Sequence, residues 1–342
     1  MKGEQKTLAE RLEGLVRSFT DEIVEFLKTI PFIEKCIPLL SLIAMARPAI
    51  IGVVILTPAA SGFLATDGFP PFKESILGII CLVLAVASAH IFNDFCDEKV
   101  DRINKRTQNR PLVLGLITRR TALIASIILS LLSLVVAFFI NIACTLFLAL
   151  GIFLIFTYST KLKRTKIGFL PPALAAFFIP LGAFAAYNGS SAFSLVAIVI
   201  GLSGFFFELV PYWSQTLPDT KGDRKRGLKT IAVCIGARKT AFSIFLSFII
   251  SLFFLLYLYK ITILSIAFLL FTSIGGGGVI LFMVWFIYKP SPKNALLVYF
   301  LSLSFIGIVS LIIIAETAYF NIDKYFNLAE KILLFLKEKL LY

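Results

Sequence analysis

Charge is scarce in this sequence, and histidine is nearly missing. Asp, Glu, Lys and Arg make up 15% of the 342 residues, whereas they supply about a quarter of an ordinary soluble domain. There is one histidine, and the cysteines form neither a CxxC pair nor a Cys/His cluster; they are Cys36, Cys81, Cys96, Cys144 and Cys234. This pattern argues against a structural zinc site and against a disulfide framework. The first 35 residues also lack the clean apolar core of a signal peptide.

Apolar residues are abundant instead. They make up 58% of the chain, and the mean hydropathy is +0.93. They come in blocks of about 20 residues, which is the length that a helix needs to cross a bilayer. We predict an all-α, multi-pass integral membrane protein with nine spans at approximately 41–65, 75–95, 121–140, 142–158, 169–187, 192–213, 240–259, 262–287 and 295–318.

The distribution of basic residues predicts the orientation. The loops after the second, fourth, sixth and eighth spans carry 7, 4, 7 and 2 Lys or Arg, whereas the other loops carry only Lys73 and Lys260. By the positive-inside rule, the N-terminus and the basic loops are cytoplasmic and the C-terminus lies outside. The net charge of +13 therefore indicates topology and attraction to anionic lipids, and we expect no nucleic-acid partner.

Segments at both ends of the chain have an amphipathic pattern. Apolar residues recur every three or four positions over 6–31, which predicts a helix on the cytoplasmic membrane surface. A coiled-coil or partner-binding helix would show the same pattern. The tail, 323–341, has a similar pattern and predicts an interfacial helix on the other side. We divide the chain into a surface segment (1–40), a membrane domain (41–318) and a C-terminal interfacial helix (319–342), and no protein partner can be inferred.

A first acidic cluster, "NDFCDEKVD", ends the second span. On a helix, Asp94, Asp97 and Asp101 share one face, and Asn93 shares a face with the last two. Such a row of like charges is destabilising unless it is neutralised. Mg²⁺ would neutralise it, because Mg²⁺ takes one or two carboxylates and completes its shell with water and substrate phosphate. A solvated helix end with salt bridges to Lys99, Arg102 and Lys105 is the simpler alternative.

A second acidic cluster, "DTKGDRKRGLKT", follows the sixth span. Asp219 and Asp223 lie four residues apart among basic residues, and Gly222 and Gly227 would permit close backbone approach. The predicted topology puts both clusters on the same side of the membrane. A third loop on that side, "YSTKLKR", begins with Tyr158. Two sets of carboxylates rimmed with Lys and Arg suit a diphosphate that is bridged by Mg²⁺.

These elements together resemble the UbiA superfamily of intramembrane prenyltransferases. "NDFCDEKVD" matches its NDxxDxxxD motif, "NRPLVLG" its Arg-Pro-Leu segment and "YSTKLKR" its Tyr/Lys loop. "DTKGDRKRGLKTIAV" matches its DxxxDxxxGxxT motif through Asp219, Asp223, Gly227 and Thr230. The resemblance covers approximately 41–318. It implies a nine-helix bundle, pseudo-symmetric between its two halves, with a central cavity that opens to lipid.

The resemblance also implies a reaction, the Mg²⁺-assisted transfer of a polyprenyl group from its diphosphate to a lipophilic acceptor. An allylic C–O bond ionises readily once the leaving diphosphate is stabilised, and an apolar cavity keeps water from the cation. We expect the catalytic residues to be Asp94, Asp97, Asp219, Asp223 and Tyr158. We expect the metal ligands to be Asp94, Asp97, Asp101, Asp219 and Asp223. We expect the diphosphate contacts to be Asn93, Arg110, Lys163, Lys161, Arg47 and Arg224.

Several of these roles have alternatives. Asp101 either binds metal or holds Arg102 or Arg110, and Tyr158 either faces the substrate or anchors the helix at the membrane interface. Arg47, just inside the first span, is expected to turn toward the cavity because an unpaired charge in lipid is costly. A transporter or flippase for an isoprenoid or phosphorylated lipid is the alternative function. The acceptor, either a quinone-type aromatic or a glycerophosphate ether-lipid precursor, is left open, as is the prenyl chain length.

Overall fold

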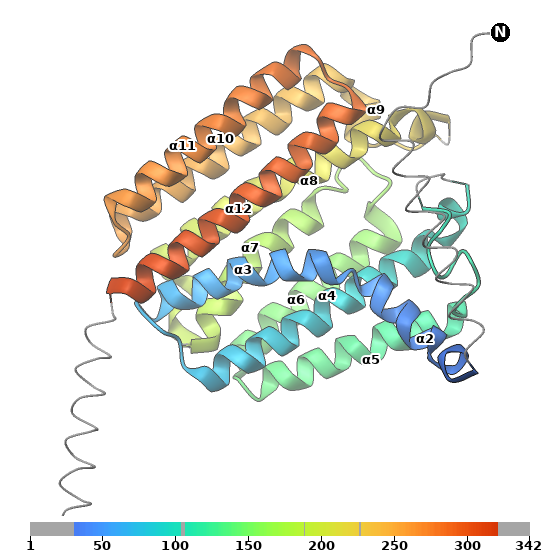
Figure 1. The fold of residues 1–342 in the computed structure, drawn as a ribbon, viewed down its shortest axis with the longest axis horizontal. Helices are drawn as coiled ribbons and strands as arrows, with labels where there is room; N and C mark the ends of the chain where they lie inside the picture. Colours follow the sequence, from blue (N-terminus) through green and yellow to red (C-terminus); the bar gives the residue numbers. More distant parts are fainter. Residues whose placement is uncertain (1–30, 104–106, 188, 226, 321–342) are drawn as a thin grey trace, which may run out of the picture.

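The structure is a computed structural model, and it describes residues 31–103, 107–187, 189–225 and 227–320. Figure 1 shows the described part of the chain as a bundle of long helices. The amphipathic segments predicted at 6–31 and 323–341 lie outside the described residues, apart from residue 31. Those two predictions therefore remain predictions.

The described residues form helices and no strand, which confirms the predicted fold class. The long elements are α2 (Pro31–Ala46), α3 (Pro48–Ala65), α4 (Phe72–Asp101), α5 (Arg119–Phe138), α6 (Ile142–Thr157), α7 (Leu170–Tyr187), α8 (Leu195–Lys225), α10 (Ala237–Ile261), α11 (Ile266–Tyr288) and α12 (Pro292–Phe320). The short elements are the π-helical turn η1 (Tyr158–Leu162), the 3₁₀ turn η2 (Gly189–Phe193) and α9 (Ile231–Ile235).

Eight of the described helices are long and apolar enough to cross a membrane. The count becomes nine if α2 and α3, which meet at an angle of 46°, form one bent span. This count agrees with the nine predicted spans. The protein is therefore an integral membrane protein with several crossings.

The bend between α2 and α3 occurs at Arg47. Its backbone is left-handed, with φ 58° and ψ 66°, and Pro48 begins the next helix. The ring of a proline disfavours right-handed helical geometry in the preceding residue, so the sequence Arg-Pro interrupts the span. A left-handed conformation costs a residue with a Cβ about 1–2 kcal/mol. The first span was predicted as one uninterrupted segment, and the structure corrects this to two helices that meet at Arg47 and Pro48.

The two ends of the bundle differ in their content of basic residues. The segments after α4, α6 and α8 carry the basic residues, and they lie at the same end of the molecule (Figure 1). We call this end the basic end, and it comprises the described residues of 102–118 and 226–236 together with 158–169 and 289–291. Both acidic motifs of the sequence reach it, because α4 and α8 both run toward it.

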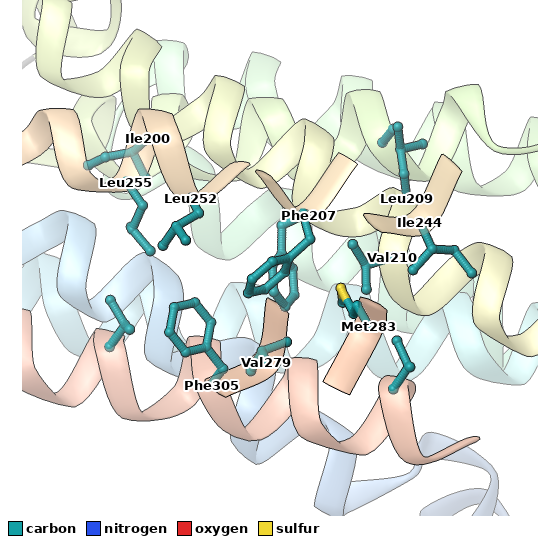
Figure 2. Packing of buried hydrophobic residues seen from close by; sticks show 14 of the residues in the cluster. Ile200, Phe207, Leu209, Val210, Ile244, Leu252, Leu255, Val279, Met283 and Phe305 are labelled. Carbon is teal, nitrogen blue, oxygen red and sulfur yellow. The ribbon is translucent and has the colours of Figure 1, made fainter. Parts of the chain in front are cut away.

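The largest apolar core lies among α8, α10, α11 and α12. Figure 2 shows Phe207 and Val210 of α8 packed against Met283 of α11 and Phe305 of α12. A Cβ on Gly276 would lie 2.8 Å from the side chain of Leu252, so this glycine lets α11 approach α10 closely. This core fixes α8 and thereby the second acidic motif.

Buried serines tie each motif helix to the next long helix. Ser88 of α4 and Ser130 of α5 lie 2.6 Å apart, and Ser88 also donates to the carbonyl of Ser126. Ser203 of α8 and Ser251 of α10 lie 3.1 Å apart. Small polar side chains allow close packing and hydrogen bonding between helices in a membrane. Both halves of the bundle therefore hold their acidic helix by the same kind of contact.

Candidate active site

The first acidic motif lies on the last turns of α4. Asp94, Asp97 and Asp101 face the interior and expose 3%, 8% and 5% of their surfaces, while Asn93 is half-buried beside them. The helical spacing of three and four residues puts them on one face, as the sequence predicted. Buried carboxylates need compensating charge, because removing them from water is expensive.

Arginines supply this compensation to two of the carboxylates. Oδ1 of Asp94 accepts from Arg47 at 2.9 Å and from Arg110 at 2.8 Å. Arg110 also donates to Oδ2 of Asp101 at 2.6 Å. Of the two partners that the sequence left open for Asp101, the structure selects Arg110, since Arg102 pairs with Glu98 instead. The predicted inward turn of Arg47 agrees with its contact to Asp94.

The turn that carries Arg110 is anchored by apolar side chains. Leu112 and Ile117 are buried against Met45, Ile91 and Ala122. The amide of Leu116 donates to the carbonyl of Pro111, and that of Gly115 donates to Leu112, which closes a helical turn. Gly115 has φ +72°, a conformation that glycine adopts without strain. The segment "NRPLVLG" thus directs Arg110 back onto α4.

Lys163 neutralises Asp97, the remaining carboxylate of the first acidic motif. Its Nζ forms an ion pair with Asp97, donates to Oδ1 of Asn93 at 2.9 Å and lies 5.7 Å from the ring centre of Tyr158. This geometry depends on η1, where α6 continues as a π-helical turn and the amide of Lys163 donates to the carbonyl of Tyr158. Such π turns are frequent at functional sites because they change the direction of side chains.

The second acidic motif lies at the end of α8, where Asp223 is buried and Asp219 is half-buried. Oδ2 of Asp223 accepts from Thr230 at 3.1 Å. The helix ends in a Schellman motif: the amide of Leu228 donates to Asp223 and that of Gly227 donates to Arg224. Gly227 has φ +70°, and a Cβ there would meet no atom within 4 Å. It is therefore needed for its left-handed backbone, and the predicted close approach at this glycine is wrong.

Two contacts join α8 and the segment after it to η1 and the segment after η1, which carries Lys163. The rings of Tyr158 and Tyr212 meet edge to face with centres 6.0 Å apart, and Tyr212 lies two turns before Asp219 on α8. The amide of Lys229 donates to the carbonyl of Arg164 at 3.4 Å, which joins the segment after α8 to the segment after η1. Asp97 is therefore linked to α8 through Lys163 and the two tyrosines.

The remaining residues near the site include two exposed cations, a tyrosine on α8 and a glutamate on α4. Lys161 and Arg224 are exposed at the basic end, and their predicted diphosphate contacts remain predictions. Tyr212 was missed, although its spacing of seven residues from Asp219 puts it on the same helical face. Glu98 pairs with Arg102 and Arg119 at 2.8 Å each. The salt bridges expected from Lys99, Arg102 and Lys105 therefore do not explain the buried aspartates as far as the described residues show.

An apolar cavity begins next to the aspartates. Its volume is about 260 Å³, and it lies among α3, α4, α6 and α7. Its upper end, which is the end nearest the aspartates, is lined by Ala89 and Phe156. Ala89 lies one turn before Asn93, and the ring of Phe156 stacks on Phe92 with centres 4.0 Å apart. Cavities of this kind bind ligands that are mostly apolar and are oriented by a few polar groups. A polar site and an apolar cavity thus lie end to end.

The donor set fits a divalent cation. In the part of the chain that the structure describes, no three His, Cys, Asp or Glu side chains form a ready-made metal site. Mg²⁺ does not require one, since it binds through one or two carboxylates and completes its octahedron with waters and phosphate oxygens. The carboxylates at the ends of α4 and α8 are hard oxygen ligands of this type, and Arg47, Arg110 and Lys163 could contact an anion beside them.

Fold and site define an integral membrane protein with two acidic motifs above an apolar cavity. The chain belongs to the UbiA prenyltransferase family, whose sequence profile matches residues 53–306. It is 32% identical over 206 residues to a digeranylgeranylglyceryl phosphate synthase of Sulfurisphaera tokodaii, over 58% of this chain and 72% of the relative. It is 27% identical over 206 residues to a protoheme IX farnesyltransferase of Symbiobacterium thermophilum, over 60% of this chain and 68% of the relative. The protein is a prenyltransferase.

Solved structures have the same fold. One, described as giving insights into digeranylgeranylglyceryl phosphate synthase in membranes, has a TM-score of 0.66 at 22% identity and covers 82% of this chain and 98% of its own. A UbiA homologue from Archaeoglobus fulgidus, bound to GPP and Mg²⁺, has a TM-score of 0.58 at 21% identity and covers 80% of this chain and 99% of its own. At these identities the likeness concerns the fold.

Proposed function

We propose that this protein transfers a polyprenyl group from its diphosphate to the hydroxyl of a glycerophosphate ether-lipid precursor, in a reaction that depends on Mg²⁺. The observation that carries the proposal is the alignment of buried acidic and half-buried cationic side chains with the apolar cavity that begins at Ala89. A prenyl diphosphate has the matching form, because it joins a doubly charged head to an apolar tail.

The cationic side chains would hold the diphosphate. Arg47 and Arg110 share Oδ1 of Asp94, and each guanidinium has further N–H groups with which to reach phosphate oxygens. Lys163, held by Asn93 and Asp97, supplies a third positive charge near them. In this proposal Asp94 and Asp101 serve mainly to orient the arginines. The sequence analysis listed both as metal ligands.

Three other carboxylates are the better candidates for the metal. Asp97 on α4 and Asp219 and Asp223 on α8 would hold Mg²⁺, which on binding supplies Lewis-acid stabilisation to the leaving diphosphate. Thr230 would orient Asp223 through its hydrogen bond. In the resulting exchange, the C–O bond breaks and diphosphate keeps the electron pair. An acceptor oxygen then bonds to the allylic carbon and loses its proton.

The aromatic side chains next to this site would protect the reacting carbon. Tyr158 and Tyr212 face each other at the junction of the polar site and the bundle, and Phe92 and Phe156 stack at the upper end of the cavity. Ring faces stabilise a nearby cation, and an apolar enclosure excludes the water that would capture it.

The choice of acceptor has two supports. Exposed basic residues form a rim at the end of the molecule that carries both acidic motifs; they are Lys161, Arg164, Lys166, Arg224 and Lys229. Such a rim attracts an acceptor that bears a phosphate. The relative from Sulfurisphaera tokodaii carries a name that contains a glyceryl phosphate. A quinone-type aromatic acceptor lacks the phosphate and would gain less from this rim.

An acceptor panel tests the proposal. Purified protein in proteoliposomes would receive Mg²⁺, labelled geranylgeranyl diphosphate and one of three acceptors: geranylgeranylglyceryl phosphate, 4-hydroxybenzoate or protohaem. We expect a labelled product and an equal amount of diphosphate with the glyceryl phosphate, and less than a tenth of that amount with the others. Product from either of the others alone would refute the acceptor, and no product with any would refute prenyl transfer from this donor.

A further inference from the structure

The depth of the apolar cavity sets the length of the prenyl tail, and we infer that Tyr187 and Ser75 form the floor that limits the tail to about four isoprene units. This inference rests on the proposed function and deepens it, because it names the donor.

The cavity is long and follows the helices. Its lining extends from Glu74 to Ala89 on α4 and from Cys144 to Phe156 on α6. The two helices run in the same direction and in register, because Phe92 stacks on Phe156 while Cys81 and Cys144 belong to one buried cluster. Positions at equal depth on the two walls can therefore be identified by counting residues from Phe92 on α4 and from Phe156 on α6.

The depth corresponds to a definite tail length. Fourteen residues separate Ala89 from Ser75, and at about 1.5 Å per residue this is about 21 Å. An extended isoprene unit adds four carbon–carbon bonds, or about 5 Å. The cavity thus accommodates about four units below the aspartates, which is a geranylgeranyl tail.

Contacts among three helices lie at the far end of the cavity. The hydroxyls of Tyr187, the last residue of α7, and Ser75 on α4 lie 3.2 Å apart. On the other side of the ring lies α3, where a Cβ on Gly62 would come within 2.8 Å of the Tyr187 hydroxyl. The Tyr187 ring therefore fits between α3 and α4 and cannot move toward α3.

The polarity of the lining changes at this floor. The walls are built from aliphatic, aromatic, glycine, proline and cysteine residues, whereas Glu74, Ser75 and Tyr187 gather at the far end. An apolar tail gains free energy along the walls. A tail with a fifth unit would have to displace the Tyr187–Ser75 contact and place carbon against polar groups.

Two glycines allow the depth to be changed without a clash. Gly78 and Gly151 both line the cavity, and a Cβ on either would meet no atom within 4 Å. Gly78 is eleven residues from Ala89, or about 16 Å, so a leucine there would leave room for three units. On the scale set by Phe92 and Phe156, Ala89 lies at a depth of about 5 Å and Gly151 at about 8 Å, so a leucine at Gly151 would leave room for no more than one unit.

The test combines four donors with these variants. Geranyl, farnesyl, geranylgeranyl and geranylfarnesyl diphosphate would be compared by kcat/KM. Thermal stabilisation by the corresponding prenyl alcohols would be measured in parallel, because this measurement needs no reaction. For the unaltered protein we expect both quantities to be highest for the geranylgeranyl compound. We expect kcat/KM to fall at least about tenfold for the geranylfarnesyl donor.

Each variant should have a stated effect. Gly78→Leu should shift the optimum to farnesyl, Gly151→Leu should lower both quantities for all four compounds, and Tyr187→Ala should admit the geranylfarnesyl donor. The matched control is Gly278→Leu on α11, because Gly278 is also an open helical glycine but lies away from the cavity. It should leave the optimum unchanged. Tyr187→Phe, which keeps the ring, should also preserve it.

The outcomes distinguish the two proposals. If geranylfarnesyl and geranylgeranyl compounds behave alike in both measurements, or if Gly78→Leu leaves the optimum unchanged, the floor does not measure the tail. Prenyl transfer would then still stand. If no donor reacts but stabilisation peaks with geranylgeraniol and shifts in Gly78→Leu, the cavity measures the tail while the proposed reaction is wrong.

Discussion

The guanidinium of Arg47 lies 2.9 Å from the carboxylate of Asp94, although the two residues are 47 positions apart. Arg47 makes this contact from a left-handed backbone at the bend between α2 and α3. Asp94 is buried, so the ion pair supplies charge where water cannot. The bend and the polar site thus depend on the same residue, which explains why a costly backbone conformation is kept.

Substitution of Arg47 separates the two roles. Both Arg47→Ala and Arg47→Gly remove the cation, and each should lower kcat/KM for the donor by about 100-fold. Only glycine adopts the left-handed backbone freely, so Arg47→Gly should be more stable than Arg47→Ala by about 1 kcal/mol. Thermal unfolding in detergent and steady-state kinetics would measure both effects. Equal stability of the two variants would show that the bend is not strained.

We predict that Lys163 is essential for activity and that an exposed lysine in the same segment is not. Its amine contacts Asn93, Asp97 and the face of Tyr158. Lys163→Met keeps the length of the side chain but removes the charge. We expect kcat/KM for the donor to fall at least about 100-fold. Lys166→Met, at an exposed position in the same segment, is the matched control and should change it less than about threefold. Similar losses in both variants would point to general electrostatic attraction.

The activity should depend on Mg²⁺, and substitution of Thr230 should change the Mg²⁺ concentration that is needed. Chelation should abolish activity, and added Mg²⁺ should restore it. Because Thr230 donates to Asp223, Thr230→Val should raise the Mg²⁺ concentration for half-maximal activity by about tenfold. Thr216→Val is the control, since the Thr216 hydroxyl bonds only to a carbonyl within α8 among the contacts described. Full activity of the unaltered protein in excess chelator would contradict this prediction.

The orientation in the membrane can be tested with thiol reagents. Cys234 is exposed on α9 at the basic end. If the basic loops are cytoplasmic, a membrane-impermeant maleimide should label Cys234 in inverted vesicles but not in intact cells. A cysteine placed by Lys73→Cys in the Cys234→Ser background lies at the opposite end and should show the reverse. Labelling of Cys234 in intact cells would invert the topology.

The helices and the acidic faces could be predicted from sequence because both depend on local pattern. The apolar blocks indicated the spans, and the spacing of Asp94, Asp97 and Asp101 indicated a shared face. The helix break at Arg47 also had a local signal in Pro48. For Gly227, the composition suggested close approach, whereas hydrogen bonding at the end of α8 shows a left-handed cap.

The pairings and the cavity could not be predicted in the same way. Residue types indicated that Arg110 and Lys163 could meet carboxylates, but the partner of each depends on how distant helices pack. The spacing of Tyr212 from Asp219 was a weak signal, because an aromatic residue in a span is common. The cavity follows from which faces of α3, α4, α6 and α7 remain apart, and periodicity shows only which residues are apolar.

The central claim is that Asp97 and Asp219, from opposite halves of the bundle, act together on one prenyl diphosphate. The most direct measurement is diphosphate release coupled to labelled product, with Asp97→Asn, Asp219→Asn and Glu98→Gln compared with the unaltered protein. Glu98 is the matched control, because it lies beside Asp97 on α4 but pairs, among the described residues, with Arg102 and Arg119 and with none of the cations that contact the aspartates. We predict losses of at least about 1000-fold for both aspartate variants and less than about threefold for Glu98→Gln, with all three proteins folded. Retention of full activity by either folded aspartate variant would contradict the account.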